Sequence, residues 1–210
     1  MASDSSDKRQ AANELTETVL KLYDSDKFSD ITIKLRDRIF HAHRIVLYAR
    51  SDNWSPDSLS KINSLNWEHI ETDISLAILK WVYTYEIDLS YSDDFVLNLM
   101  KHAGEFKLMN LIKHCEKKLI ESSCFENCIN FYTISGEINA LLLKNHCAGL
   151  ISKYWNRFTS KNFKDMNAVL LYQIVKTNTE YPLHSAVKFH RPDLVEVYLT
   201  ENKSEVSKFF

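Results

Sequence analysis

The stretch that decides the fold reads FSDITIKLRDRIFHAHRIVLYARS and spans residues 28–51. Apolar and polar side chains alternate over residues 31–35, which is the period-two pattern of a half-buried strand. Residues 36–38 are all charged and predict a turn, and residues 39–42 predict a returning strand. Apolar side chains over residues 43–50 then predict a short helix. We therefore expect a β-hairpin that leads directly into a helix.

The rest of the chain predicts helices with little strand. Every position from 57 to 181 is free of proline, which breaks helix interiors, so a long and nearly continuous helical region is allowed. Residues 52–61 are polar, contain Pro56 and predict a loop or a frayed helix. Residues 67–71 predict a short additional strand. Helical spacing of apolar residues predicts further helices at about 76–83, 95–103, 108–119, 125–135, 138–158 and 166–177.

The N-terminal region predicts an amphipathic helix that precedes any core. Residues 1–9 are polar and we expect them to be disordered. Over residues 10–24, Leu15, Val19, Leu22 and Tyr23 fall at i, i+4, i+7 and i+8, on one helical face. That face must pack either on its own domain or on a second chain, and we favour a second chain.

Composition excludes several classes of function. Hydrophobic residues make up 45% and charged residues 26% of the 210 residues, which is typical of a globular protein. The net charge of −2 provides no electrostatic surface for nucleic acid. The polar N-terminus lacks the apolar run of a signal peptide, and no stretch approaches the length of a membrane span, so we expect a cytoplasmic protein without membrane insertion. The four cysteines are then expected to be reduced thiols.

Two groups of residues could bind metal, and we interpret both as structural. His41 and His43 lie at the edge of a predicted strand, but a zinc site needs about four suitably placed ligands. Cys124 and Cys128 stand one helical turn apart, yet cysteine is among the most buried residue types and no CxxC spacing occurs. There is also no G-x-S-x-G nucleophile motif. We expect no catalytic residue, no cofactor and no metal, and therefore not an enzyme.

Three stretches of the sequence resemble the BTB (POZ) domain. FSDITI at residues 28–33 and FHAHRIVLYARS at residues 40–51 are similar to its signature, and LKWVYTYEI at residues 79–87 is similar to a later helix end. The resemblance covers about residues 28–120 and implies a small sheet flanked by helices. It also implies that Asp30 and Arg44 face each other in a charged pocket near a dimer interface. Many BTB domains dimerise through an apolar N-terminal helix, which would assign Leu15, Val19, Leu22 and Tyr23 to that interface.

The second half of the chain carries two weaker resemblances. The helices from 124 to 177 are similar to the BACK-type extension that often follows a BTB domain. Residues 181–187, YPLHSAV, resemble the T-P-L-H-x-A opening of an ankyrin repeat, with Tyr181 in place of threonine. Its motif residues would be Pro182, Leu183, His184 and Ala186, and residues 193–199 would form the second helix of the repeat.

These resemblances imply an α+β fold with four parts. They are a disordered tail and N-terminal dimerisation helix (1–29), a BTB/POZ domain (30–121), an all-α BACK-like domain (122–178) and the start of an ankyrin-repeat region (179–210). This order resembles rabankyrin-type proteins, which also carry many ankyrin repeats and a FYVE domain. We interpret the chain as a fragment or a short isoform, because a lone repeat needs neighbours for stability.

The resemblance to rabankyrin-type proteins implies a function in endosomal trafficking. Such proteins act on early endosomes as effectors of Rab-class GTPases, in endosome fusion, endocytosis and macropinocytosis. We therefore expect a homodimerising, non-enzymatic interaction module that is peripheral on early endosomes in the full-length form.

A second hypothesis is a substrate-recognition adaptor of a cullin-3 ubiquitin ligase, the role of many BTB–BACK proteins. Those adaptors generally carry a hydrophobic-x-Glu motif before a core strand. Residues 56–65 (PDSLSKINSL) contain no glutamate, which disfavours cullin-3 as a partner.

Overall fold

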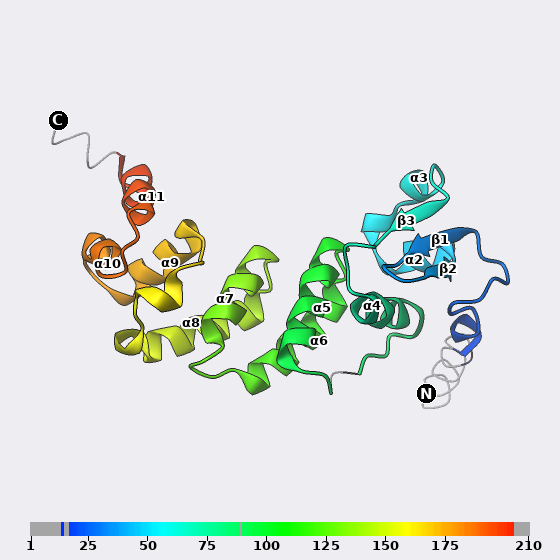
Figure 1. The fold of residues 1–210 in the computed structure, drawn as a ribbon, viewed down its shortest axis with the longest axis horizontal. Coiled ribbons are helices and arrows are strands. Elements are labelled where there is room, and N and C mark those ends of the chain that lie inside the picture. Colours follow the sequence, from blue (N-terminus) through cyan, green and yellow to red (C-terminus); the bar gives the residue numbers. More distant parts are fainter. Residues whose placement is uncertain (1–13, 15–16, 89, 204–210) are drawn as a thin grey trace, which may run out of the picture. The chain divides into compact units, whose positions relative to one another are not determined.

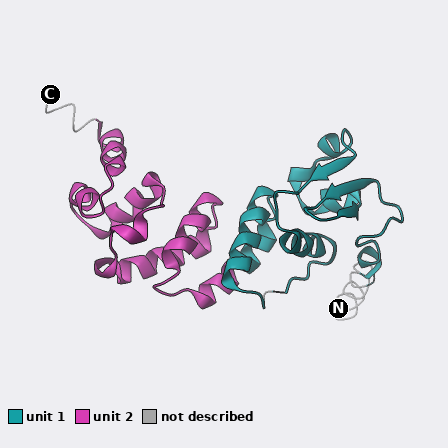
Figure 2. Ribbon diagram, in the orientation of Figure 1, with its two compact units in different colours: residues 1–115 teal, residues 116–210 magenta. Residues whose placement is uncertain are grey.

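The computed structural model describes residues 14, 17–88 and 90–203, and these fall into two compact units. The first unit is residues 1–115 and the second is residues 116–210 (Figure 2). The division lies inside one helix, Met109–Ser122. The predicted fold class is confirmed, because a sheet with helices is followed by a helical region. The finer domain boundaries of the sequence analysis stay predictions.

The first unit is built on a three-stranded sheet (Figure 1). Its strands are β1 (Ile31–Lys34), β2 (Ile39–Ala42) and β3 (Ser64–Asn66), in the order β2-β1-β3. The hairpin is antiparallel, with Ile33 opposite Phe40, whereas β3 runs parallel to β1. Ile33 and Phe40 are fully buried, as the alternation in the sequence predicts.

Helices complete this unit. They are α2 (Arg44–Arg50), a 3-10 turn (Asp52–Trp54), α3 (Pro56–Leu59), α4 (Thr72–Thr84), α5 (Asp93–Glu105) and the first half of α6 (Met109–Ser122). Helix α4 packs against both α2 and α5, and its residues Ile78, Leu79 and Val82 have no exposed surface. The core of the unit therefore lies between the sheet, α2 and α4.

One strand of this unit was predicted in the wrong place, whereas residues 52–61 do contain a short helix, one of the two alternatives predicted there. The third strand is Ser64–Asn66, not 67–71, although the N–H of Trp67 still donates to the Lys34 carbonyl at 2.8 Å. The chain then turns, because the Ile70 N–H bonds back to the Trp67 carbonyl. Within 52–61, the short helix α3 is ordered by Ser55, whose hydroxyl accepts from the Ser58 N–H, and by Pro56 in its first turn.

The second unit consists of packed helices in the part of the chain that the structure describes. They are α7 (Cys128–Glu137), α8 (Leu141–Lys153), two 3-10 turns (Trp155–Arg157 and Ser160–Phe163), α9 (Ala168–Asn178), α10 (Pro182–Lys188) and α11 (Asp193–Glu201). Helices α7 and α8 form an αα-hairpin, and α9 packs against α8, α10 and α11. The helix predicted at 138–158 begins later, at Leu141, since Asn139 adopts a left-handed φ of 59° just before it, and it ends earlier, at Lys153.

A buried carboxylate from α6 caps the N-terminus of α8. Glu116 is only 3% exposed, and its Oε1 accepts from the N–H groups of Leu142 at 2.9 Å and Leu143 at 3.1 Å. The preceding residue, Ala140, provides no side-chain cap. Glu116 therefore satisfies two of the backbone donors that a helix N-terminus leaves open.

A run of aromatic rings continues through the second unit. Phe163 is fully buried and lies 5.5 Å from Phe158 and 4.9 Å from Phe189, measured between ring centroids. Arg191 stabilises the same region, because its guanidinium donates hydrogen bonds to the carbonyls of Phe163 at 2.6 Å and Met166 at 2.8 Å. Aromatic packing and one arginine thus join α10 and α11 to the segment before α9.

Candidate interaction surface

Asp30 and Arg44 face each other, as the family resemblance implies. The Oδ1 of Asp30 accepts from the Arg44 N–H at 2.8 Å, and Arg44 Nη1 lies 3.6 Å from Asp30 Oδ2. His43, the residue before α2, makes no side-chain cap, so Asp30 caps this helix from another segment. The pair thereby fixes the start of α2 beside the start of β1.

The guanidinium of Arg44 also donates hydrogen bonds to three backbone carbonyl groups. Its Nη1 donates to the Asp30 carbonyl, its Nε to Leu59 at 3.0 Å and its Nη2 to Ile62 at 2.6 Å. These acceptors lie before β1, at the end of α3 and in the loop before β3. Arg44 therefore holds α2 against the chain around it, a use of the planar guanidinium that lysine could not reproduce. Its predicted place at a dimer interface stays a prediction.

His43 is a structural core residue. It is 3% exposed, its Nδ1 lies 2.9 Å from the Tyr83 hydroxyl and its Nε2 lies 2.9 Å from the Lys27 carbonyl. A carbonyl only accepts, so Nε2 carries the hydrogen and Nδ1 accepts from Tyr83. The same hydroxyl accepts from the His43 backbone N–H at 3.1 Å. Both ring nitrogens are thus engaged within the protein, which agrees with the structural interpretation of the His41–His43 pair.

The end of the predicted N-terminal dimerisation segment packs against the first unit of its own chain. The Tyr23 ring packs edge-on against Phe40 at 5.1 Å and Tyr83 at 5.6 Å, and burial raises the pKa of its phenol. Asp24 accepts from the His41 N–H and pairs with Arg38. Tyr23 therefore contributes to the core of its own chain, and its role in a dimer stays a prediction.

The remaining residues of that segment are more open. Val19 and Leu22 are half-buried, and Leu20 is 46% exposed. Leu15 lies outside the described residues. The described helical residues 17–20 give way to a turn at 21–24, so the helix ends earlier than the predicted residue 24.

Helix α2 presents an apolar face that the sequence analysis did not single out. Ile45 is 74% exposed and Tyr48 is 51% exposed, and their spacing of three residues places them on one side of the helix. Beside them, a groove of about 340 Å³ is lined by these two residues together with Arg44, Pro56, Leu59 and Ser60. Exposed apolar side chains that adjoin an apolar groove are typical of a protein-interaction surface. The signal in the sequence was a short helix whose two sides are both apolar.

The ankyrin-like motif begins α10. Pro182 occupies the first turn of the helix, and Tyr181 makes no side-chain cap, as expected from the replacement of threonine. Ala186 is buried, whereas Leu183 is 43% exposed and His184 is exposed. Helix α11 lies where the motif predicts its second helix, and the assignment of this region to an ankyrin repeat stays a prediction.

Three of the four cysteines are buried. Burial raises the pKa of the Cys147 thiol to about 12 and that of Cys128 to about 11. Cys124 is exposed. The prediction that Cys124 and Cys128 are core residues is confirmed for Cys128 and wrong for Cys124, which lies outside the helix that Cys128 begins.

Within the described residues, no helix has the length and apolar character needed to cross a membrane.

Known proteins resemble this chain over most of its length. Rabankyrin-5 of Homo sapiens is 40% identical over 188 residues, which is 90% of this chain and 16% of that protein. Rabankyrin-5 of Mus musculus is 39% identical over the same shares. The solved BTB domain of zebrafish PATZ1 matches with a TM-score of 0.48 and 22% identity, covering 55% of this chain and 95% of that domain. The chain thus spans 16% of the length of the rabankyrin-5 relatives.

The family model for the BTB/POZ domain matches residues 19–123, which include the sheet, the Asp30–Arg44 pair and helices α2 to α6. The chain belongs to the BTB/POZ domain family and is homologous to rabankyrin-5.

Proposed function

We propose that this chain is the homodimerising, non-enzymatic interaction module of an endosomal trafficking adaptor. The observation that carries the proposal is the exposed apolar face of α2, formed by Ile45 and Tyr48 beside the Pro56–Leu59 groove. BTB domains commonly mediate dimerisation, and a two-fold dimer uses the same patch on both chains. The apolar face of α2 can serve as such a self-complementary patch. Val19 and Leu22 of the N-terminal segment would extend the apolar surface of the interface.

Dimerisation gives the module its mechanism. Two joined chains present two copies of every binding site that follows in the sequence. Once one site is bound, the second binds at a high effective concentration, so avidity rises without any new contact. The BTB unit would therefore set the valency, and the helices after residue 116 would carry the partner-binding parts.

The dimer is tested by the molar mass of the chain in solution. Ile45→Asp with Tyr48→Asp places two charges on the proposed seam, where they would be buried without partners, so we expect a monomer. Light scattering coupled to gel filtration measures the mass. The matched control is Val187→Asp, because Val187 is 75% exposed on α10, close to the exposure of Ile45. An unchanged dimer mass for the double variant would remove the proposed seam.

The N-terminal segment is tested separately. Leu15→Asp with Leu22→Asp is expected to weaken the same dimer. If the α2 variant is monomeric while this variant stays dimeric, the interface is formed by α2 alone.

The endosomal part of the proposal rests on the homology to rabankyrin-5. We propose that the full-length form is a cytoplasmic protein that binds peripherally to early endosomes and has Rab-class GTPases as partners. A fluorescent fusion of the full-length protein should colocalise with early endosomes, and its binding to Rab GTPases should require GTP. Diffuse fluorescence, or equal binding to the GDP forms, would contradict this part and leave the dimer unaffected.

A further inference from the structure

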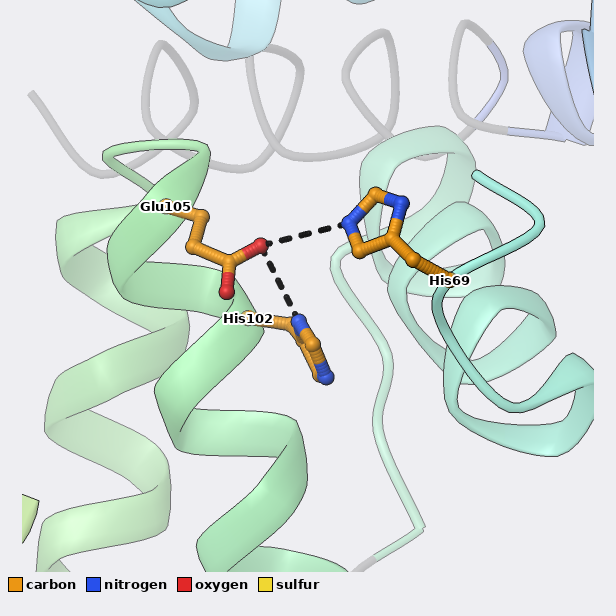
Figure 3. Close-up of side chains that lie close together, drawn as sticks. All are labelled: His69, His102 and Glu105. Atoms are coloured by element: carbon orange, nitrogen blue, oxygen red, sulfur yellow. Dashed lines mark hydrogen bonds and ion pairs between the residues drawn. The ribbon is translucent and has the colours of Figure 1, made fainter. Parts of the chain in front are cut away.

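Two histidines and one glutamate of the first unit converge on its surface. His69 lies in the turn after β3, whereas His102 and Glu105 lie in the last turn of α5 (Figure 3). The Oε2 of Glu105 lies 3.1 Å from His102 Nδ1 and 3.7 Å from His69 Nε2, and all three ligand atoms fall within 4.8 Å of one another. None of them belongs to the proposed dimer surface.

We propose that His69, His102 and Glu105 form a binding site for a divalent transition-metal ion of the zinc class. Imidazole nitrogen and carboxylate oxygen bind zinc at about 2.0–2.2 Å, so two ligand atoms at a tetrahedral angle lie about 3.3 Å apart. The two distances from Glu105 Oε2 to the histidine nitrogens lie on either side of this value. Two histidines with one glutamate form an established zinc ligand set, and a water molecule takes the fourth position.

Hydrogen bonding explains only half of the cluster. The His102 ring is within hydrogen-bond distance of Glu105, whereas 3.7 Å from His69 Nε2 to Glu105 Oε2 is too long for a direct hydrogen bond. A single ion accounts for both rings pointing at the same oxygen atom, as Figure 3 shows. Imidazole ligands also favour zinc over magnesium or calcium, which prefer oxygen.

The neighbouring core holds the ligands in place. Ile70 and Ala103, each adjacent to a histidine ligand, are fully buried, and Trp67 is 2% exposed. The Trp67 ring stacks on Phe106 at 4.4 Å, which joins the turn to the end of α5. The ligand backbone is therefore fixed before an ion binds, and the ion would add a second link between the same two segments.

The ligand side chains remain reachable from solvent. The His69 side chain is 58% exposed and that of Glu105 is 41% exposed, whereas His102 is 17% exposed. An ion can therefore enter without unfolding. The site is expected to stabilise the turn and the end of α5.

The proposal is tested with the untagged, chelator-treated 210-residue chain. Calorimetric titration with zinc chloride should give one saturable site, with no comparable heat for magnesium chloride. Cobalt(II) should give the visible absorption of a tetrahedral complex. Zinc should also raise the melting temperature, since an ion that binds only the folded chain stabilises it.

Single-ligand variants separate a site from general histidine binding. His69→Ala, His102→Ala and Glu105→Gln should each weaken zinc binding by more than about tenfold, the loss that even outer partners of a metal cause. The matched controls are His114→Ala and His146→Ala, since both histidines are exposed and lie outside the cluster. These controls should bind zinc as the parent chain does.

Circular dichroism without metal checks that each variant folds. Zinc binding of unchanged affinity in the His69→Ala and His102→Ala variants would overturn the proposal. So would the absence of a saturable zinc site in the parent chain.

Discussion

The two units of this chain are stabilised in different ways. In the first unit, polar side chains join segments that are distant in sequence: buried His43 connects Lys27 with Tyr83, and partly exposed Arg44 donates to the carbonyls around α2. In the second unit, neighbouring helices pack through aromatic rings, and charged groups such as Glu116 bond to helix ends. A sheet needs specific long-range pairing, whereas helical hairpins form mainly local contacts. Polar bonds between distant segments hold the sheet and its flanking helices together in the first unit. In the second unit, Glu116 and Arg191 make such bonds beside a run of aromatic rings.

The largest expected effect breaks the aromatic run of the second unit. Phe163→Ala removes a fully buried ring that contacts Phe158 and Phe189, so we expect a loss of about 3–5 kcal/mol in the free energy of unfolding. Urea denaturation measures it, and hydrogen exchange should show the loss in α9 to α11. Phe28→Ala is the matched control, because Phe28 is 87% exposed and its loss should stay within about 0.5 kcal/mol. A similar loss in both variants would refute the role of the aromatic run.

A smaller effect is expected at the carboxylate that caps α8. Glu116→Ala leaves two backbone N–H groups without their acceptor, which costs about 1.5–3 kcal/mol. Glu116→Gln keeps one oxygen acceptor and should lose less. Glu121→Ala is the control on the same helix, since Glu121 is exposed. If Glu116→Gln is as stable as the parent chain, the charge itself contributes nothing and only the acceptor matters.

The polar network of the first unit predicts a third effect. Tyr83→Phe keeps the ring but removes the hydroxyl that serves the His43 N–H and Nδ1, so we expect a loss of about 1–2 kcal/mol. Thermal and urea unfolding measure it. Tyr181→Phe is the control, because Tyr181 is 62% exposed. Amide hydrogen exchange should become faster in β2 and α2. Faster exchange only in the second unit would contradict the role of this polar network in the first unit.

The elements with regular patterns could be predicted from the sequence. The β1–β2 hairpin follows from strict alternation, and α11 from its place in the ankyrin-like motif. Strand β3 could not, because Ser64–Asn66 has three residues and only one half-buried apolar side chain. Its pairing with β1 is a tertiary interaction that local pattern does not encode. The break between α7 and α8 was predicted, but a few residues too early, because left-handed Asn139 provides no glycine or proline signal.

The candidate sites were predicted less completely than the fold. Asp30 and Arg44 came from a family motif, and the structure places them together. The open face of α2 was missed because a pattern of apolar residues cannot show which of them the core leaves exposed. The His69–His102–Glu105 cluster was missed because His69 reaches α5 only through the parallel strand β3 and the turn that follows it. The one local signal is the spacing of His102 and Glu105 by three residues on a helix.

The smallest expected effect concerns the thiols of the second unit at alkaline pH. Burial raises the pKa of Cys128 to about 11 and that of Cys147 to about 12, above the usual value of 9.0. The unfolded chain therefore releases these protons at a lower pH than the folded chain. Their contribution to stability is complete below about pH 9 and is lost as the pH rises through the folded pKa values.

This loss is measured by urea unfolding at a series of pH values between neutrality and pH 11. Cys128→Ala with Cys147→Ala should flatten the alkaline decline, even though the smaller side chains lower stability at every pH. Cys124→Ala should leave the decline unchanged, because Cys124 is exposed. At neutral pH the buried thiols should also resist iodoacetamide while Cys124 reacts, since the thiolate is the nucleophile. Rapid alkylation of Cys147 in the folded chain would show that its surroundings open easily, and the second unit would then be packed less firmly than its aromatic run implies.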